Sequence, residues 1–353
     1  MNRLCQSSYG SLEAVINLAN FDGDGRRKLV HFSRQRATGE WSACAVVSDY
    51  PSSGGSIIQN VSKRCAGQDH GDFEVLVLEN GGAVRHYTRD NTILDDYAWK
   101  RSATVNSLLN MNLPNTNSTD AAPLVQSQIS MGSSTDGTCL ETAILEDTGS
   151  MVHYRCPQHQ ANNISLEDSC QWYRSSTIAQ GATGPACLYQ PTPDNLMALV
   201  PTVSGIGRYR FHAGSKSWMS IAVMPGMTGP ACVYSIPTLG EIVFHAFIRD
   251  GYEINEKICR GPEFEDTSSP LPPSFDHIRD TLYHKVFRTI PLSIASQSNS
   301  ALGDSPNTEA IVFHASGTGY QDAWIVLHWS LPAGNDEWVV TSVVLKHVIG
   351  MPI

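Results

Sequence analysis

A short pattern recurs six times along this chain and constrains the fold more than any other feature. Each copy begins with one residue, Glu in five of the six copies, followed by a mainly apolar run. The copies start at Glu13, Glu74, Glu141, Leu196, Glu241 and Glu309, so neighbouring copies lie 45 to 68 residues apart. The distance from the sixth copy through the chain end and back to the first falls in the same range. Such repeats indicate a series of similar units, and a repeat that closes on its own period favours a ring.

Further strand-like segments follow each copy. The second segment pairs a basic residue with an aromatic one at His31-Phe32, His86-Tyr87, His153-Tyr154, Arg208-Tyr209 and His328-Trp329, and is degenerate near Tyr252 in the fifth copy. The third segment opens with an aromatic residue, at Trp41, Trp99, Trp172, Trp218, Phe287 and Trp338. A short fourth segment is clearest at 185–189 and 230–234. Four strands repeated six times predict an all-β fold, a six-bladed β-propeller with four antiparallel strands per blade.

The chain ends fit this arrangement. The segment 3–7 resembles a fourth strand, with Cys5 at the place of Cys187 and Cys232, and the sixth repeat ends soon after its third strand. We therefore expect the N-terminal strand to close the last blade, which would remove exposed sheet edges. The prediction is a single propeller domain over 1–353, with blades at approximately 11–65, 66–130, 131–190, 191–235, 236–300, and 301–353 plus 2–8.

Composition excludes several classes of function. The net charge is −10 and no tract of Lys or Arg occurs, which argues against a nucleic-acid partner because such binding needs a basic surface. No apolar run approaches the ~20 residues that span a bilayer, so we expect no membrane span. The sequence contains no zinc-type Cys/His spacing, P-loop or dinucleotide-binding glycine pattern, so we expect no metal and no cofactor.

Cysteines and sequons favour the secretory pathway or an extracellular location. The chain has nine cysteines, and N-x-[ST] sequons predict glycosylation at Asn60, Asn117 and Asn163. Cys156 and Cys170 bracket one loop and could form a disulfide across its base. Residues 1–20 lack the pattern of a signal peptide, so an intracellular location stays open.

Two long loops predict where a site lies. The loops 156–170 and roughly 256–282 would both roof one end of the central channel, and loops of this length in a compact fold are usually functional. A pocket roofed in this way suits a small apolar ligand. Candidate polar groups near that end are Asp69, His70, Arg89, Asp90, Arg155, His159, His212, His277 and His284. The repeated histidines are expected to stabilise the blades, the repeated glutamates to hydrogen-bond to neighbouring blades, and the repeated tryptophans to pack between blades.

One motif resembles a calcium loop. The segment 20–25 carries Asp22, Gly23, Asp24 and Gly25, but Arg26, Lys28 and His31 follow where oxygen ligands would be needed. Because Asp-Gly between two strands is also ordinary hairpin chemistry, we interpret the segment as a turn.

The blade signature, as in 73–78 with Phe73 and Glu74, 84–90 with His86, and Trp99, resembles two related groups of propellers. One group is the fungal and bacterial propeller lectins of the fucose-binding type. The other is the fungal lectin-like propellers that act as hetero-Diels–Alderases in tropolonic sesquiterpene biosynthesis. The lectins repeat an Arg, a Glu and an aromatic residue in most blades, whereas the blades of this chain have diverged, which favours a single asymmetric site and the second group.

That resemblance implies a cofactor-independent cycloaddition. A hydroxymethyl tropolone would lose water to give a quinone methide, which would add across an alkene of a humulene-type sesquiterpene alcohol. The partners would thus be small apolar or aromatic molecules, a tropolone and a sesquiterpene. The expected catalytic donors are Arg89, Arg155, His159, His212 and Tyr252, and the expected substrate-binding residues are His70, Asp90, His277 and His284. The alternatives are a carbohydrate-binding lectin without catalytic activity and a scaffold that binds another protein on one propeller face.

Overall fold

In a computed structural model, the described residues of the chain form twenty-four strands, arranged as six antiparallel sheets of four consecutive strands. The structure describes residues 4–7, 11–19, 21–35, 37–60, 71–91, 97–107, 130–133, 139–146, 148–157, 171–189 and 195–225, together with the strands between 231 and 349. For β9 and for the last two sheets the structure describes the backbone only. Ser330 is the exception, because its side chain is also described. None of the residues described forms a helix, so none of them supplies an apolar helix long enough to cross a membrane.

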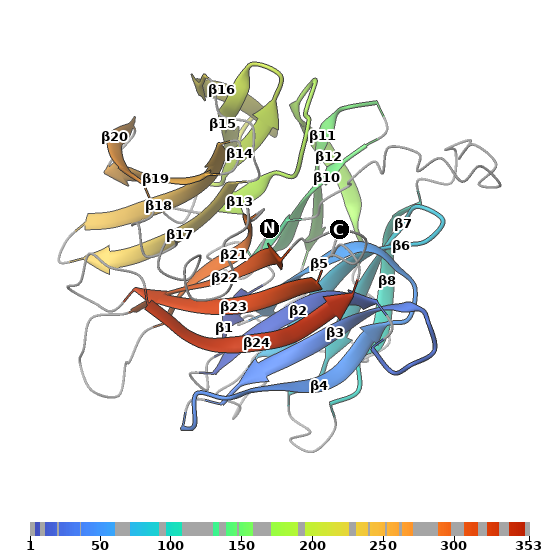
Figure 1. The fold of residues 1–353 in the computed structure, drawn as a ribbon. Coiled ribbons are helices and arrows are strands. Elements are labelled where there is room, and N and C mark those ends of the chain that lie inside the picture. Colours follow the sequence, from blue (N-terminus) through green and yellow to red (C-terminus); the bar gives the residue numbers. More distant parts are fainter. Residues whose placement is uncertain are drawn as a thin grey trace.

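The sheets follow one another along the chain (Figure 1). Sheet 1 contains β1 (Leu4–Gln6), β2 (Leu12–Ala19), β3 (Arg27–Arg34) and β4 (Trp41–Ser48). Sheet 2 contains β5 (Pro51–Asn60), β6 (Asp72–Glu79), β7 (Ala83–Arg89) and β8 (Lys100–Ser107). Sheet 3 contains β9 (Ser130–Ser133), β10 (Cys139–Leu145), β11 (Met151–Pro157) and β12 (Tyr173–Ala179).

The remaining three sheets have the same order. Sheet 4 contains β13 (Cys187–Tyr189), β14 (Met197–Thr202), β15 (Gly205–His212) and β16 (Ser217–Met224). Sheet 5 contains β17 (Ala231–Thr238), β18 (Glu241–Asp250), β19 (Glu253–Arg260) and β20 (Glu263–Pro270). Sheet 6 contains β21 (Thr289–Gln297), β22 (Asn307–Ser316), β23 (Ala323–Leu331) and β24 (Val339–Ile349).

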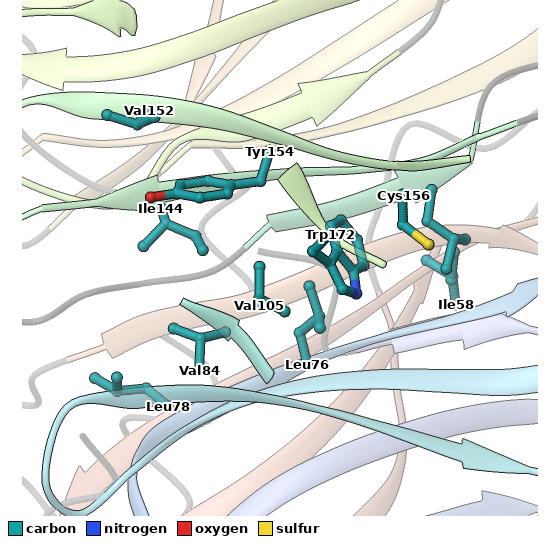
Figure 2. Packing of buried hydrophobic residues seen from close by; sticks show 11 residues of the cluster. Ile58, Leu76, Leu78, Val84, Val105, Ile144, Val152, Tyr154, Cys156 and Trp172 are labelled. Carbon is teal, nitrogen blue, oxygen red and sulfur yellow. The ribbon is translucent and has the colours of Figure 1, made fainter. Parts of the chain in front are cut away.

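The core lies between neighbouring sheets. The second strand of a sheet is buried on both faces, as in β6, where every residue from Phe73 to Leu78 is buried, because apolar layers cover both sides of it. Figure 2 shows one such layer, in which Leu76 and Val84 of sheet 2 face Tyr154 and Trp172 of sheet 3. Similar layers join sheet 1 to sheet 2 and sheet 3 to sheet 4.

The first strands of the sheets are in contact in cyclic order. Strand β1 lies against β5, and the series continues through β9, β13 and β17 to β21, which in turn lies against β1. Sheet 6 is accordingly drawn between sheet 1 and sheet 5 in Figure 1. The predicted all-β class and the four-stranded antiparallel repeat are confirmed.

The predicted closure of the last blade by the N-terminal strand is wrong. Strand β1 pairs with β2 of sheet 1, with Cys5 opposite Glu13, and sheet 6 is built entirely from 289–349. The short strands at Cys5, Cys187 and Cys232 are correctly recognised as similar, but each begins a sheet rather than ending one. The blade boundaries predicted from the sequence therefore shift by one strand. A cyclic repeat looks the same whichever strand is counted first, and only the hydrogen bonds of the short strand decide to which sheet it belongs.

The predicted long loop 256–282 is wrong over its first half. Residues 256–260 belong to β19 and 263–270 form β20, and the acidic and Ser-rich sequence of β20 concealed a strand that pairs through its backbone. In the other predicted loop, Cys156 and Pro157 end β11. Phe287 and Trp338 lie outside the described residues.

A β-bulge recurs at the basic-aromatic pair. The register between the third and fourth strands shifts between His31 and Phe32 in sheet 1, and at the equivalent steps at His86, His153, Arg208 and His328. A bulge adds one residue to the outer strand and increases its twist. The dipeptide that marks the repeat in the sequence thus marks a bend in each of these five sheets.

Candidate functional site

Four predicted site residues lie at equivalent ends of successive sheets. Arg89 and Arg155 are at or near the ends of β7 and β11, Asp90 directly follows β7, and His212 ends β15. The topology therefore places these residues at the same end of their respective sheets. The predicted residues His70, His159, Tyr252, His277 and His284 lie outside the described residues.

A buried Glu-His pair recurs in sheets 1 to 3. His31, His86 and His153 are fully buried, and their Nε2 atoms lie 2.8, 2.8 and 2.6 Å from carboxylate oxygens of Glu13, Glu74 and Glu141. Each pair joins the second and third strands of one sheet. The prediction that these glutamates bond to neighbouring blades is therefore wrong, because the histidine two positions along the adjacent strand is within reach of the carboxylate.

The same histidines contact tryptophans of the next sheet. His31, His86 and His153 meet Trp99, Trp172 and Trp218 in edge-to-face geometry, with ring centroids 5.5, 5.7 and 5.3 Å apart. Trp172 also donates a hydrogen bond of 3.4 Å from Nε1 to His86 Nδ1, so the neutral tautomer of His86 donates through Nε2 to Glu74. For these residues the predicted structural roles of the repeated histidines and tryptophans are confirmed.

Arg89 lies between sheet 1 and sheet 2. Only 8% of its surface is exposed, and its guanidinium carbon lies 4.3 Å from the ring centroid of Tyr97 and 5.6 Å from that of Phe73. Within the described part of the chain Arg89 forms no ion pair, and its Nε has no hydrogen-bond acceptor. Burial raises the pKa of the Cys44 thiol on sheet 1, and the positive charge of Arg89 partly offsets this rise.

Arg155 lies between sheet 3 and sheet 4 and forms an ion pair with Glu141. Its Nε donates to both carboxylate oxygens of Glu141 at 3.0 Å, and its Nη2 lies 2.9 Å from Oε1. The guanidinium carbon is 5.7 Å from the ring centroid of Phe211. Burial alone would lower the pKa of Arg155, but the hydrogen bonds and charge of Glu141 outweigh it and raise the pKa.

The space between sheet 2 and sheet 3 has no arginine at this position among the residues described. Cys156 pairs with Leu140 as Arg89 pairs with Phe73, and it lies against Trp172 and Ile58 (Figure 2). Cys156 is disulfide-bonded. Its pairing with Cys170 stays a prediction, because Cys170 lies outside the described residues.

His212 serves a local turn. Nδ1 of its exposed ring accepts hydrogen bonds from the backbone N–H of Ser215 at 3.2 Å and from Ser215 Oγ at 3.1 Å. These bonds hold the hairpin between β15 and β16, in which Lys216 has a positive φ of 51°. Nothing in its described surroundings links His212 to the arginines.

The prediction of a glycosylation site at Asn60 is wrong for the folded chain. Asn60 is fully buried, and its Nδ2 donates to Glu74 Oε1 at 3.2 Å, so a glycan on that nitrogen has no room. Asn117 and Asn163 lie outside the described residues.

The Asp-Gly segment is a turn, and the ammonium group of Lys28 lies among its carboxylates. The ammonium of Lys28 bonds to Asp22 and lies 3.3 Å from carboxylate oxygens of both Asp24 and Asp49. The hydrogen bond to Asp22 is the main reason that the pKa of Lys28 is raised. Among the described residues, no group of three or more His, Cys, Asp or Glu is arranged to hold a metal.

Sequence reasoning missed the aromatic cover of Arg89 and the ion-pair partner of Arg155. Phe73 pairs directly with Arg89 across the hairpin of β6 and β7, and Glu141 pairs with Arg155 across β10 and β11. The tight turn at 80–82 could have predicted the first pairing, because hairpin register follows from turn length.

Comparisons with known proteins show likeness in fold alone. No family model matches the chain, and no curated protein matches it significantly. SapL1 lectin, solved in complex with alpha methyl fucoside, superposes with a TM-score of 0.57 at 12% identity, covering 97% of this chain and 95% of the lectin. BP39L lectin from Burkholderia pseudomallei gives 0.57 at 13% identity, covering 98% and 85%. The Aleuria aurantia lectin, described as a six-bladed β-propeller with a novel mode of fucose recognition, gives 0.51 at 14% identity, covering 96% and 97%.

Proposed function

We propose that this protein is a six-bladed β-propeller lectin that binds sugars in the spaces between neighbouring sheets. The observation that carries the proposal is the likeness over nearly the whole chain to propellers solved as fucose-binding lectins. The cyclic contact of the six first strands supports a complete propeller.

The arginine and aromatic side chains that lie in two of the spaces between sheets support sugar binding. Arg89 lies with Phe73 and Tyr97 between sheets 1 and 2, and Arg155 lies with Phe211 between sheets 3 and 4. A guanidinium presents several N–H donors in one plane, which suits adjacent sugar hydroxyls, and an aromatic face suits the apolar face of a sugar ring. We propose these spaces as the binding sites.

Isothermal titration of the purified protein with methyl α-L-fucoside tests the proposal. We expect saturable binding that Arg155→Gln weakens at least fivefold. The matched control is Arg174→Gln, because Arg174 is an exposed arginine of β12 that lies opposite Tyr154 and pairs with Glu146 rather than with Glu141. Absence of binding to fucoside and to a panel of other immobilised glycans would rule out the lectin.

The cycloaddition implied by the sequence resemblance is the alternative function. The observation in its favour is that the three described inter-sheet spaces differ, with an unpaired arginine in one, Cys156 in the next and an Arg-Glu pair in the third. A turnover assay with a hydroxymethyl tropolone and humulenol, compared with a protein-free control, separates the two functions. Formation of a single stereoisomer faster than in the protein-free control would support the cycloaddition and rule against the lectin proposal.

A further inference from the structure

We propose that the space between sheets 1 and 2 takes a sugar that carries a carboxylate, and that Arg89 is the residue that binds this carboxylate. The inference rests on the proposed lectin function and adds the chemical class of the ligand at one site. It follows from three features of Arg89: its missing counter-ion, the two rings that cover it, and its contrast with Arg155.

Arg89 carries a buried charge with no described counter-ion. Its side chain is more than nine-tenths buried, yet none of the ion pairs among the described residues includes it and its Nε has no acceptor. Arginine is rarely buried without a partner, because removing a guanidinium from water is costly unless an anion compensates it. An anionic group on a ligand would supply that compensation.

The nearby acidic groups are already engaged. The carboxylate of Glu13 bonds to His31 at 2.8 Å and accepts from Ser33 Oγ at 3.1 Å. Burial, and then the negative charge of Glu13, raise the pKa of the Cys44 thiol, so it stays neutral near Arg89 at physiological pH. Among the described residues, no ion pair joins Arg89 to either group.

Two aromatic rings define how a ligand meets the guanidinium. Phe73 is buried and Tyr97 is 44% exposed, and both lie within cation–π distance of Arg89. Rings against the guanidinium leave its in-plane N–H donors as the available groups, and two parallel N–H donors match the two oxygens of a carboxylate. The half-exposed ring of Tyr97 also gives a sugar ring an apolar surface beside the charge.

Arg155 provides the internal comparison. It projects from β11 into the space between sheets 3 and 4, one residue out of register with Arg89, and Glu141 satisfies its charge through bonds from Nε and Nη2. A neutral sugar needs no further anion there. Among the described residues, the same fold thus holds one arginine that a carboxylate compensates and one that no carboxylate compensates.

Calorimetric titration with matched ligands tests the inference. The probes are methyl β-D-glucuronide, methyl β-D-glucoside, which lacks the carboxylate, methyl α-L-fucoside, and sodium acetate as a bare anion. We expect the glucuronide to bind at least tenfold more tightly than the glucoside. Arg89→Gln should abolish this preference, Arg89→Lys should retain part of it, and Arg174→Gln should leave it unchanged.

The outcomes separate this inference from the function on which it rests. Equal binding of glucuronide and glucoside, or a preference that survives in Arg89→Gln, would overturn the role of Arg89 while fucoside binding still supports the lectin. Failure of all three sugars to bind would reject both proposals. Acetate that competes as well as the glucuronide would show a bare anion site. Circular dichroism and the melting temperature check that Arg89→Gln is folded. We expect its melting temperature not to fall, because the substitution removes a buried charge that has no counter-ion among the described residues.

Discussion

The residues that recur from one repeat to the next are those that connect strands within a sheet and connect neighbouring sheets. In sheets 1 to 3 a buried glutamate holds a histidine of the same sheet, and the histidine ring meets a tryptophan of the next sheet. The arginines at the ends of the third strands differ in their partners instead. Residues that support the fold are thus repeated, and residues available to a ligand have diverged.

Glu74 offers a direct test of the repeated pair. Glu74→Leu removes the hydrogen-bond partner of both His86 and Asn60, which are fully buried. We expect the free energy of unfolding to fall by about 1–3 kcal/mol for each group left without a partner, measured by urea unfolding followed by tryptophan fluorescence. Glu40→Leu, at an exposed position, is the control and should change stability by no more than about 0.5 kcal/mol. Equal effects of the two substitutions would show that the buried pair contributes nothing.

Tyr87 predicts an alkaline loss of stability. Burial, followed by the hydrogen bond that it donates to Glu79, raises the pKa of Tyr87 to about 12. Because the unfolded phenol titrates near 10, the protonated form stabilises the fold below about pH 10, and this contribution disappears as the pH rises towards 12. Tyr87→Phe should therefore lose less stability than the wild type between these pH values in parallel urea titrations. Identical slopes would contradict the assignment.

At the scale of elements, local sequence patterns predict which segments form strands, but they do not predict which strands pair with each other. In each sheet except the fifth, the second strand has the predicted apolar run, the third strand has the basic-aromatic pair, and the fourth strand begins at or next to the predicted aromatic residue. The short first strands have no mark that tells on which side they pair. Their hydrogen bonds to the following strand shift every predicted blade boundary.

The hairpin of β2 and β3 tests the interpretation of the Asp-Gly segment. The ammonium of Lys28 already lies among Asp22, Asp24 and Asp49. We expect the melting temperature of the wild type to be the same in millimolar calcium chloride and in EDTA. Lys28→Met should lower the melting temperature, because three carboxylates are then close together without a cation. A wild-type protein stabilised by calcium would overturn the turn interpretation.

At the scale of the whole molecule, neighbouring sheets share their cores. The apolar layers that join sheets 1 to 4 each draw side chains from two sheets, so a single sheet has no complete core of its own. In such repeat architectures stability depends on the interfaces between neighbours. These sheets should therefore unfold together.

Leu76→Ala tests this coupling. Leu76 is fully buried in the layer between sheets 2 and 3, and we expect the substitution to cost about 2–5 kcal/mol while fluorescence and circular dichroism still give one coincident transition. Val203→Ala, at a turn position that is 86% exposed, is the control and should have little effect. Two separate transitions in Leu76→Ala would show that the sheets unfold independently.

The sequence by itself determined the all-β class, the sixfold repeat and most strands, because alternation and the recurring Glu, His and Trp positions are properties of residues close along the chain. It also placed Arg89 and Arg155 at the same end of their sheets. Tertiary structure decided which sheet each first strand joins, and it decided that Arg155 has a carboxylate partner whereas Arg89 has two aromatic rings and no described counter-ion. Those differences arise from the surroundings that neighbouring strands and sheets create, and no single repeat carries that information.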